Sequence, residues 1–133
     1  MHPSLNEPAS TLEQCSIKFM LAVKSALISD GRSAIENQFS FMNLSDMAMH
    51  IYALNSVVAR TSRAYSIGLK YSNHELNLAF MQCNQSSNRI NESFQRIITS
   101  KNGMGIENLR MTVAEHIFRS NGQSTIHSLS RNY

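Results

Sequence analysis

The sequence predicts an all-α protein, folded as an up-down-up-down four-helix bundle. Apolar residues recur every three or four positions along most of the chain, capping sequences separate these segments, and no stretch alternates as a strand would. A chain of 133 residues is long enough for one domain with one core. Short loops make consecutive helices antiparallel neighbours, which gives the up-down order.

We expect a single helical domain over residues 1–133, with boundaries set by caps. Three Ser-x-x-Glu sequences have the spacing of a capping box, namely Ser10–Glu13, Ser33–Glu36 and Ser72–Glu75. Glycines that can end a helix stand at Gly31, Gly103 and Gly122, and the second helix is expected to run to about Gly68. The expected helices cover about residues 10–29, 34–68, 73–100 and 105–121, and a polar tail covers 122–133.

One apolar stripe on each expected helix should face a common core. The stripe of the third helix runs from Leu76 to Ile97 with an almost regular spacing of threes and fours. Taken together, the stripes predict a core of Phe19, Leu44, Ile51, Leu54, Val58, Phe80, Cys83, Ile90, Phe94 and Val113.

The composition favours a surface that contacts other protein. Charged residues make up 16% of the chain, below the usual quarter or so, and serine and asparagine supply much of the remaining polarity. The net charge of +3 comes from single, scattered lysines and arginines, so no nucleic-acid partner is expected. No run approaches the roughly twenty apolar residues of a transmembrane helix.

No residue is predicted to be catalytic, to bind a cofactor or to bind a metal ion. The five histidines do not stand in any recognised metal-binding pattern. His74 and Glu75 are adjacent, but the place of Glu75 in a capping box explains it without catalysis. Cys15 and Cys83 lie on apolar stripes, where buried, reduced thiols are the usual finding, and two cysteines are too few for a disulfide framework.

Methionine is frequent in this chain, with eight residues. Because methionine fills irregular gaps, its occurrence at helical spacing favours a role as core filler over an adaptable binding surface. This interpretation applies to Met20, Met42, Met47, Met49, Met81, Met104 and Met111.

Arg60 and Arg63 are the candidate interface residues. They stand three positions apart in "ARTSRAY", so they project from one side of the second helix near its C-terminal end. A favourable interaction with the helix dipole accounts for both arginines without any function. Pairing with carboxylates of another chain or domain is the alternative, because arginine is favoured at interfaces.

The stretch "YALNSVVARTSRAYSIGLKYSNHELNLAFMQC" resembles the C-terminal helical domain of one acyl-CoA dehydrogenase branch. That branch contains the very-long-chain acyl-CoA dehydrogenases and acyl-CoA dehydrogenase family member nine. The resemblance begins at "HPSL" and weakens after Ile98; the run "IGLK...HE...LA...C" is more similar to family member nine. It is densest at Arg60, Arg63, Ile67, Gly68, Leu69, His74, Glu75 and Cys83.

The resemblance implies a domain that is not an enzyme on its own. In this branch the FAD, the acyl-CoA pocket and the catalytic glutamate belong to a dehydrogenase core upstream, as does the loop that contacts the membrane. The expected partners are therefore that core and a homodimer mate. The expected roles are dimer architecture and protein association, in fatty-acid β-oxidation or in complex I assembly.

The resemblance also implies a mitochondrial location, on the matrix side of the inner membrane. The start of the chain, "MHPSLNEP", does not have the pattern of a targeting sequence, and Met1 stands where the family has ordinary chain, so a fragment is expected. The alternative function is a free-standing helical adaptor that binds a partner protein through a methionine-rich groove.

Overall fold

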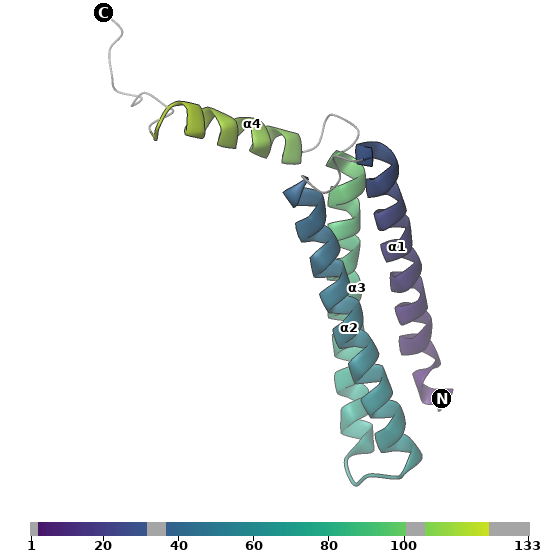
Figure 1. Cartoon of the computed structure of the whole chain (residues 1–133). Coiled ribbons are helices and arrows are strands. Elements are labelled where there is room, and N and C mark those ends of the chain that lie inside the picture. Colours follow the sequence, from purple (N-terminus) through teal and green to yellow (C-terminus); the bar gives the residue numbers. More distant parts are fainter. Residues whose placement is uncertain (1–2, 32–36, 101–105, 123–133) are drawn as a thin grey trace, which may run out of the picture. The chain divides into compact units, whose positions relative to one another are not determined.

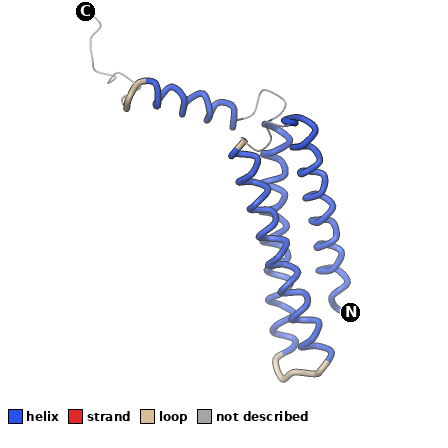
Figure 2. Tube along the Cα trace, in the orientation of Figure 1, coloured by secondary structure: helices blue, strands red, loops and turns tan. Residues whose placement is uncertain are grey.

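The computed structural model describes residues 3–31, 37–100 and 106–122, and all regular structure within them is helical (Figure 2). The elements are the 3₁₀ helix η1 (Pro3–Leu5), α1 (Asn6–Asp30), α2 (Gln38–Ser66), α3 (Ser72–Ser100) and α4 (Ile106–Arg119). The predicted all-α class is confirmed. Residues 1–98 form one compact unit, which contains α1, α2 and α3, and α4 belongs to a second unit. The up-down-up-down order of four helices therefore stays a prediction.

Within the first unit, α1, α2 and α3 lie side by side and run in alternating directions (Figure 1). The side chain of Lys18 in α1 donates a hydrogen bond of 2.6 Å to Oδ1 of Asn91 in α3. Near the other end of α3, the hydroxyl of Tyr65 donates to Oδ1 of Asn73, at 3.2 Å, and so joins the end of α2 to the start of α3. Polar contacts between helices thus lie at the margins of an apolar centre.

The core of this unit is formed by all three helices. Its buried members are Cys15 and Ala22 of α1, Met47, Leu54 and Val58 of α2, and Cys83, Ile90 and Ile97 of α3. The burial predicted for Leu54, Val58, Cys83 and Ile90 is confirmed. The side chains that pack against the cluster while remaining partly exposed include Phe19, Leu44, Ile51 and Phe94.

Two residues of the predicted core are placed differently. Phe80 is only partly buried and lines a surface pocket beside Cys83. Val113 lies on α4, where it is 57% exposed, so the core of the first unit is formed without it. The spacing of Val113 with Leu109 and Ile117 was correct for an apolar stripe. Among the described residues of the second unit, however, no other helix lies against that stripe to bury it.

The first helix begins earlier than the capping box predicted. α1 starts at Asn6, so Ser10 and Glu13 lie inside the helix and the predicted box at these residues is wrong. Pro8 occupies the first turn of α1. A proline is tolerated there because the N–H that it lacks would have no partner within the helix.

The second helix begins at a cap that was not among the predicted ones. Asn37 precedes α2, and its Oδ1 accepts a 3.1 Å hydrogen bond from the N–H of Ser40, which satisfies one of the free donors of the first turn. The predicted box Ser33–Glu36 lies outside the described residues.

The predicted end of the second helix near Gly68 is confirmed, and its geometry explains the glycine. Gly68 has φ +68°, a left-handed conformation that side chains with a Cβ disfavour. Its N–H donates to the carbonyl of Tyr65, and the N–H of Leu69 donates to the carbonyl of Ala64. These two bonds form a Schellman motif, which satisfies the last carbonyls of α2 and turns the chain toward α3.

The methionines are mostly not core filler. Met47 is fully buried, as predicted, but the exposed fraction is 52% to 69% for Met20, Met42, Met49, Met81 and Met111. Met104 lies outside the described residues. The prediction fails for these five because helical spacing places a residue on some face of its helix and does not identify the face that meets a neighbour. The alternative, an adaptable binding surface, gains support.

Leu54 tests the position of the core. Leu54→Ala should lower the free energy of unfolding by about 2–5 kcal/mol, because a fully buried side chain is replaced by a cavity. Tyr52→Ala is the matched control on the same helix: Tyr52 is 76% exposed, so its truncation should change stability by about 0.5 kcal/mol or less. Urea unfolding measures both, and equal effects at the two positions would contradict the assigned core.

Candidate functional site

Arg60 is placed at the α2–α3 end of the first unit, where it forms an ion pair within the chain. Its Nη2 lies 3.4 Å from Oε1 of Glu75 in α3. The side chain of Arg60 is 79% exposed and that of Glu75 is 23% exposed. The pair joins two helices that are already connected by a short turn, and the solvent around Arg60 limits its strength.

The predicted capping role of Glu75 is wrong. The backbone N–H of Ser72 donates to the carbonyl of Leu69, and the carboxylate of Glu75 accepts from Arg60 through Oε1. The second oxygen, Oε2, is buried and has no hydrogen-bond partner. The spacing of a capping box is present in the sequence, but in the structure the carboxylate of Glu75 pairs with Arg60 of the preceding helix.

A shallow pocket of about 490 Å³ surrounds this ion pair. Thr61 and Tyr71 line it together with the pair, and so does the exposed His74. The two adjacent residues His74 and Glu75 thus reach the same pocket, but Glu75 is held by Arg60. This arrangement is that of a structural ion pair at the surface.

Arg63 lies in the last turn of α2, and its side chain is exposed. A cation in this position interacts favourably with the negative end of the helix dipole. The structure therefore separates the two arginines: Arg60 joins α2 to α3, and Arg63 has the position for a dipole interaction. An interface role for either arginine stays a prediction.

A double-mutant cycle tests the pairing of Arg60 with Glu75. Arg60→Gln should lower the free energy of unfolding by roughly 0.2–1 kcal/mol, as expected for an exposed ion pair. Glu75→Gln should add little in that background, because the same interaction is already lost. The matched control is Arg63→Gln, whose effect should be additive with that of Glu75→Gln. Additive effects for Arg60 and Glu75 would contradict the pairing.

The interface role of the arginines is tested separately from stability. If they also contact another chain, the double variant Arg60→Gln/Arg63→Gln should keep its helical content while binding to that chain weakens sharply. Circular dichroism and sedimentation of the variant measure these two properties. Unchanged association with only a slightly lower stability would mean that the helix dipole and the ion pair with Glu75 fully explain the two arginines.

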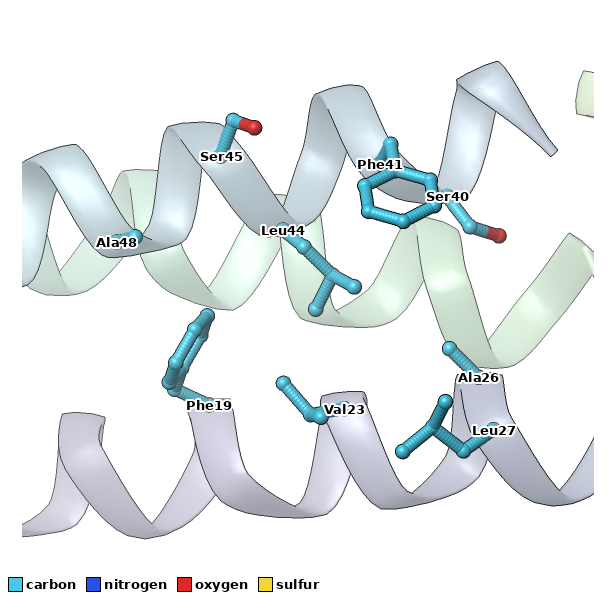
Figure 3. Close-up of a pocket in the computed structure, with 9 residues that line it drawn as sticks. All are labelled: Phe19, Val23, Ala26, Leu27, Ser40, Phe41, Leu44, Ser45 and Ala48. Carbon is cyan, nitrogen blue, oxygen red and sulfur yellow. The ribbon is translucent and has the colours of Figure 1, made fainter. Parts of the chain in front are cut away.

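An apolar groove of about 340 Å³ lies between the C-terminal half of α1 and the N-terminal half of α2 (Figure 3). Phe19 and Val23 extend from α1 toward α2, and Leu44 extends from α2 toward α1. The other lining residues are Ala26, Leu27, Ser40, Phe41, Ser45 and Ala48. The two serines supply its only side-chain hydroxyls and no methionine lines it, so the predicted methionine-rich groove does not correspond to this one.

Both cysteines are buried free thiols in the core, as predicted. Burial raises the pKa of the Cys15 thiol, against smaller opposing effects of a hydrogen bond with Ser87 and the charge of Lys18. Burial, together with nearby Cys15 and Glu7, raises the pKa of Cys83 to about 11. Because the thiolate is the reactive form, neither cysteine has the environment of a nucleophile.

The raised pKa of Cys83 predicts a loss of stability at high pH. The thiol ionises near pH 9 in the unfolded chain and near pH 11 in the folded protein, so its contribution is complete below pH 9 and is lost as pH rises toward 11. Cys83→Ala should therefore show a shallower fall of unfolding free energy between these pH values than the wild type. Urea unfolding across the range measures this slope, and parallel curves would contradict the buried thiol.

Among the residues that the structure describes, no group of three His, Cys, Asp or Glu side chains could hold a metal ion. In the same ranges, none of the helices has both the length and the apolar character needed to cross a membrane.

Comparison with known proteins shows the family. Residues 3–123, which include every described helix, match the family ACAD9/ACADV, C-terminal domain. The chain belongs to this family. The resemblance found in the sequence is thereby confirmed.

Members of the ACAD9/ACADV C-terminal domain family occur within much longer proteins. The mitochondrial very long-chain specific acyl-CoA dehydrogenase of Mus musculus is 28% identical over 100 residues, which are 75% of this chain and 15% of the relative. Its counterparts in Macaca fascicularis and Bos taurus are each 30% identical, over 69% and 70% of this chain and 14% of their own lengths. The aligned part of this chain thus spans about 15% of the mouse relative.

For this C-terminal domain, the structure accounts for residues at which the resemblance is densest. Gly68 supplies the positive φ that ends α2, and Arg60 and Glu75 join α2 to α3. Cys83 is part of the apolar core. Each of these residues therefore has a role in folding, and none of them needs a catalytic role to explain its presence.

Proposed function

We propose that this domain is a non-catalytic helical part of a mitochondrial acyl-CoA dehydrogenase, where it supports dimer architecture and protein association. The match of residues 3–123 to a C-terminal domain supports the proposal. The relatives of the chain are acyl-CoA dehydrogenases, and the matching segment is a small share of their length. The FAD and the acyl-CoA pocket belong, in this proposal, to the dehydrogenase core of the parent protein.

The distribution of apolar side chains supports an association role. The first unit encloses a core and also leaves the α1–α2 groove open, with Leu27 and Phe41 in its lining each about half exposed. An apolar surface of this kind, on a chain with only 16% charged residues, is typical of a face that contacts protein. The partners that we propose are the dehydrogenase core and a second subunit.

The pathway follows the parent protein. Fatty-acid β-oxidation fits the names of the relatives from mouse, macaque and cattle, which are very long-chain specific acyl-CoA dehydrogenases of mitochondria. The family description also includes ACAD9, so assembly of respiratory complex I is the other role within the same proposal. In either case we place the protein in mitochondria, on the matrix side of the inner membrane.

A helical adaptor is the second candidate function, and the exposed methionines favour it. Met20, Met49 and Met81 are each at least 60% exposed, and flexible methionine side chains suit surfaces that accept more than one partner. The two functions differ in the partner that they require. The domain of a dehydrogenase should bind the dehydrogenase core, whereas an adaptor should not.

The isolated chain tests the non-catalytic role directly. Purified protein should contain no flavin absorbance and should not reduce an electron acceptor in the presence of palmitoyl-CoA. Bound flavin in stoichiometric amount, with acceptor reduction, would contradict the proposal.

A chimera tests the association role. In the mouse very long-chain specific enzyme, the matching C-terminal segment is replaced by residues 3–123 of this chain. The chimera should assemble to the oligomeric mass of the intact enzyme and should have its acyl-CoA dehydrogenase activity. The same chimera with Leu54→Ala should be less stable. A chimera no better assembled than the enzyme with the segment deleted would contradict the role.

A further inference from the structure

The pocket around the Arg60–Glu75 pair contains a carboxylate oxygen that the described part of the chain leaves without a partner. Oε1 of Glu75 lies 3.4 Å from Nη2 of Arg60, whereas Oε2 is buried and accepts no hydrogen bond. A polar atom in this state is unfavourable, because the water that it has lost is not replaced. The side chain of Glu75 as a whole is 23% exposed, so a small rotation of the carboxylate brings Oε2 to the pocket.

The guanidinium of Arg60 has N–H groups that its contact with Glu75 does not use. That contact is made by Nη2 alone, and a guanidinium carries several more N–H donors in one plane. The side chain of Arg60 is 79% exposed, so these donors are open to a molecule in the pocket. Such donors pair best with a carboxylate. The pocket therefore presents donors for an acidic group directly beside an acceptor for an N–H group.

The charges around the pocket select against a simple cation and against a simple anion. The lining contains Arg60, and the ammonium of Lys70 lies 5.5 Å from the ring centroid of Tyr71, which also lines the pocket. The sequence has no acidic residue between Asp46 and Glu75. A ligand cation at Glu75 would be repelled by these basic groups, and a bare anion would be repelled by Glu75 itself. A carboxylate with an N–H group next to it satisfies both sides.

The rest of the lining includes an apolar part contributed by Val57 of α2 and Leu78 of α3. Leu78 is 48% exposed, and Val57 is partly buried. Each of them stands three residues from a member of the ion pair on its own helix, so it lies on the same side of that helix. An apolar group attached between the carboxylate and the N–H group would cover these two side chains and remove their surface from water.

We propose that this pocket binds a carboxylate ligand that carries an amide N–H and an apolar side chain on the same carbon, which is the chemistry of an N-acylated apolar amino acid. The carboxylate accepts from the unused N–H groups of Arg60, and the amide N–H donates to Oε2 of Glu75. The apolar side chain packs on Leu78 and Val57. A free N-acyl amino acid and the C-terminal residue of a polypeptide both present these groups. The site does not rest on the association role proposed above.

Small ligands that each lack one group test the contacts, with the full chain as the protein. N-acetyl-leucine should bind with a dissociation constant of about 1 mM or lower, and should shift the backbone amide NMR signals of the pocket lining. N-acetyl-leucinamide lacks the carboxylate, N-acetyl-N-methyl-leucine lacks the N–H, and N-acetylglycine lacks the side chain. Each of these should bind about tenfold more weakly. Equal binding of the leucinamide or the N-methyl ligand would overturn the proposal.

Variants of the chain assign each preference to its residue. Arg60→Gln should abolish the preference for N-acetyl-leucine over its amide, and Glu75→Leu should abolish the preference for the N–H ligand over the N-methyl ligand. The matched control is Arg63→Gln, which removes the same charge from an exposed position of α2 outside the lining and should keep both preferences. Circular dichroism checks that helical content is unchanged. Preferences that persist in Arg60→Gln and Glu75→Leu would place the binding elsewhere and overturn the proposal.

A peptide that ends in leucine distinguishes the two sources of the ligand. Tighter binding of the peptide than of N-acetyl-leucine, lost when its C-terminus is amidated, would support the site and assign it to polypeptide C-termini. Equal binding would support the site and assign it to a free N-acyl amino acid. Absence of binding by both at about 10 mM would overturn the proposal. That result would leave the association role intact, because the chimera tests that role separately.

Discussion

The burial of one apolar seam between α1, α2 and α3 is the interaction on which the rest of the structure depends. Leu54 and Ile90 are completely buried at its centre, and Cys15 brings α1 against them. Burial of a side chain of this size contributes about 1.5–3 kcal/mol, whereas an exposed ion pair such as Arg60–Glu75 contributes at most about 1 kcal/mol. The apolar seam therefore contributes more to holding the three helices together than any single polar contact between them.

The turn between α2 and α3 shows how local and tertiary effects are combined. Gly68 permits the left-handed conformation that ends α2, and the chain then returns as α3 after only a few residues. This return brings Glu75 beside Arg60, and the carboxylate pairs with the arginine instead of capping its own helix. The resulting ion pair has a structural explanation, so it supports no catalytic role for the adjacent His74.

The features of this domain that its fold leaves unexplained lie on its surface. Burial raises the pKa of both cysteine thiols, Gly68 ends α2, and Arg60 pairs with Glu75. The features that packing within the chain leaves unexplained are apolar and exposed: the groove between α1 and α2, and the side chains of Ile17, Met20 and Leu21 on α1. Both are suited to contact with protein, which agrees with membership of a family of C-terminal domains found within larger dehydrogenases.

The sequence by itself determined the helical class, the apolar stripes of α2 and α3, the burial of both cysteines and the end of α2 at Gly68, because periodicity and glycine conformation are local properties. The true start of α1, the partner of Glu75 and the exposure of Met20 were decided only by the tertiary structure. Several residues could cap a helix end or pair with a carboxylate, and the tertiary structure decides which of them lies close enough to do so. Spacing likewise predicts an apolar stripe on α1, but only packing shows that Cys15 faces the core and Met20 faces outward.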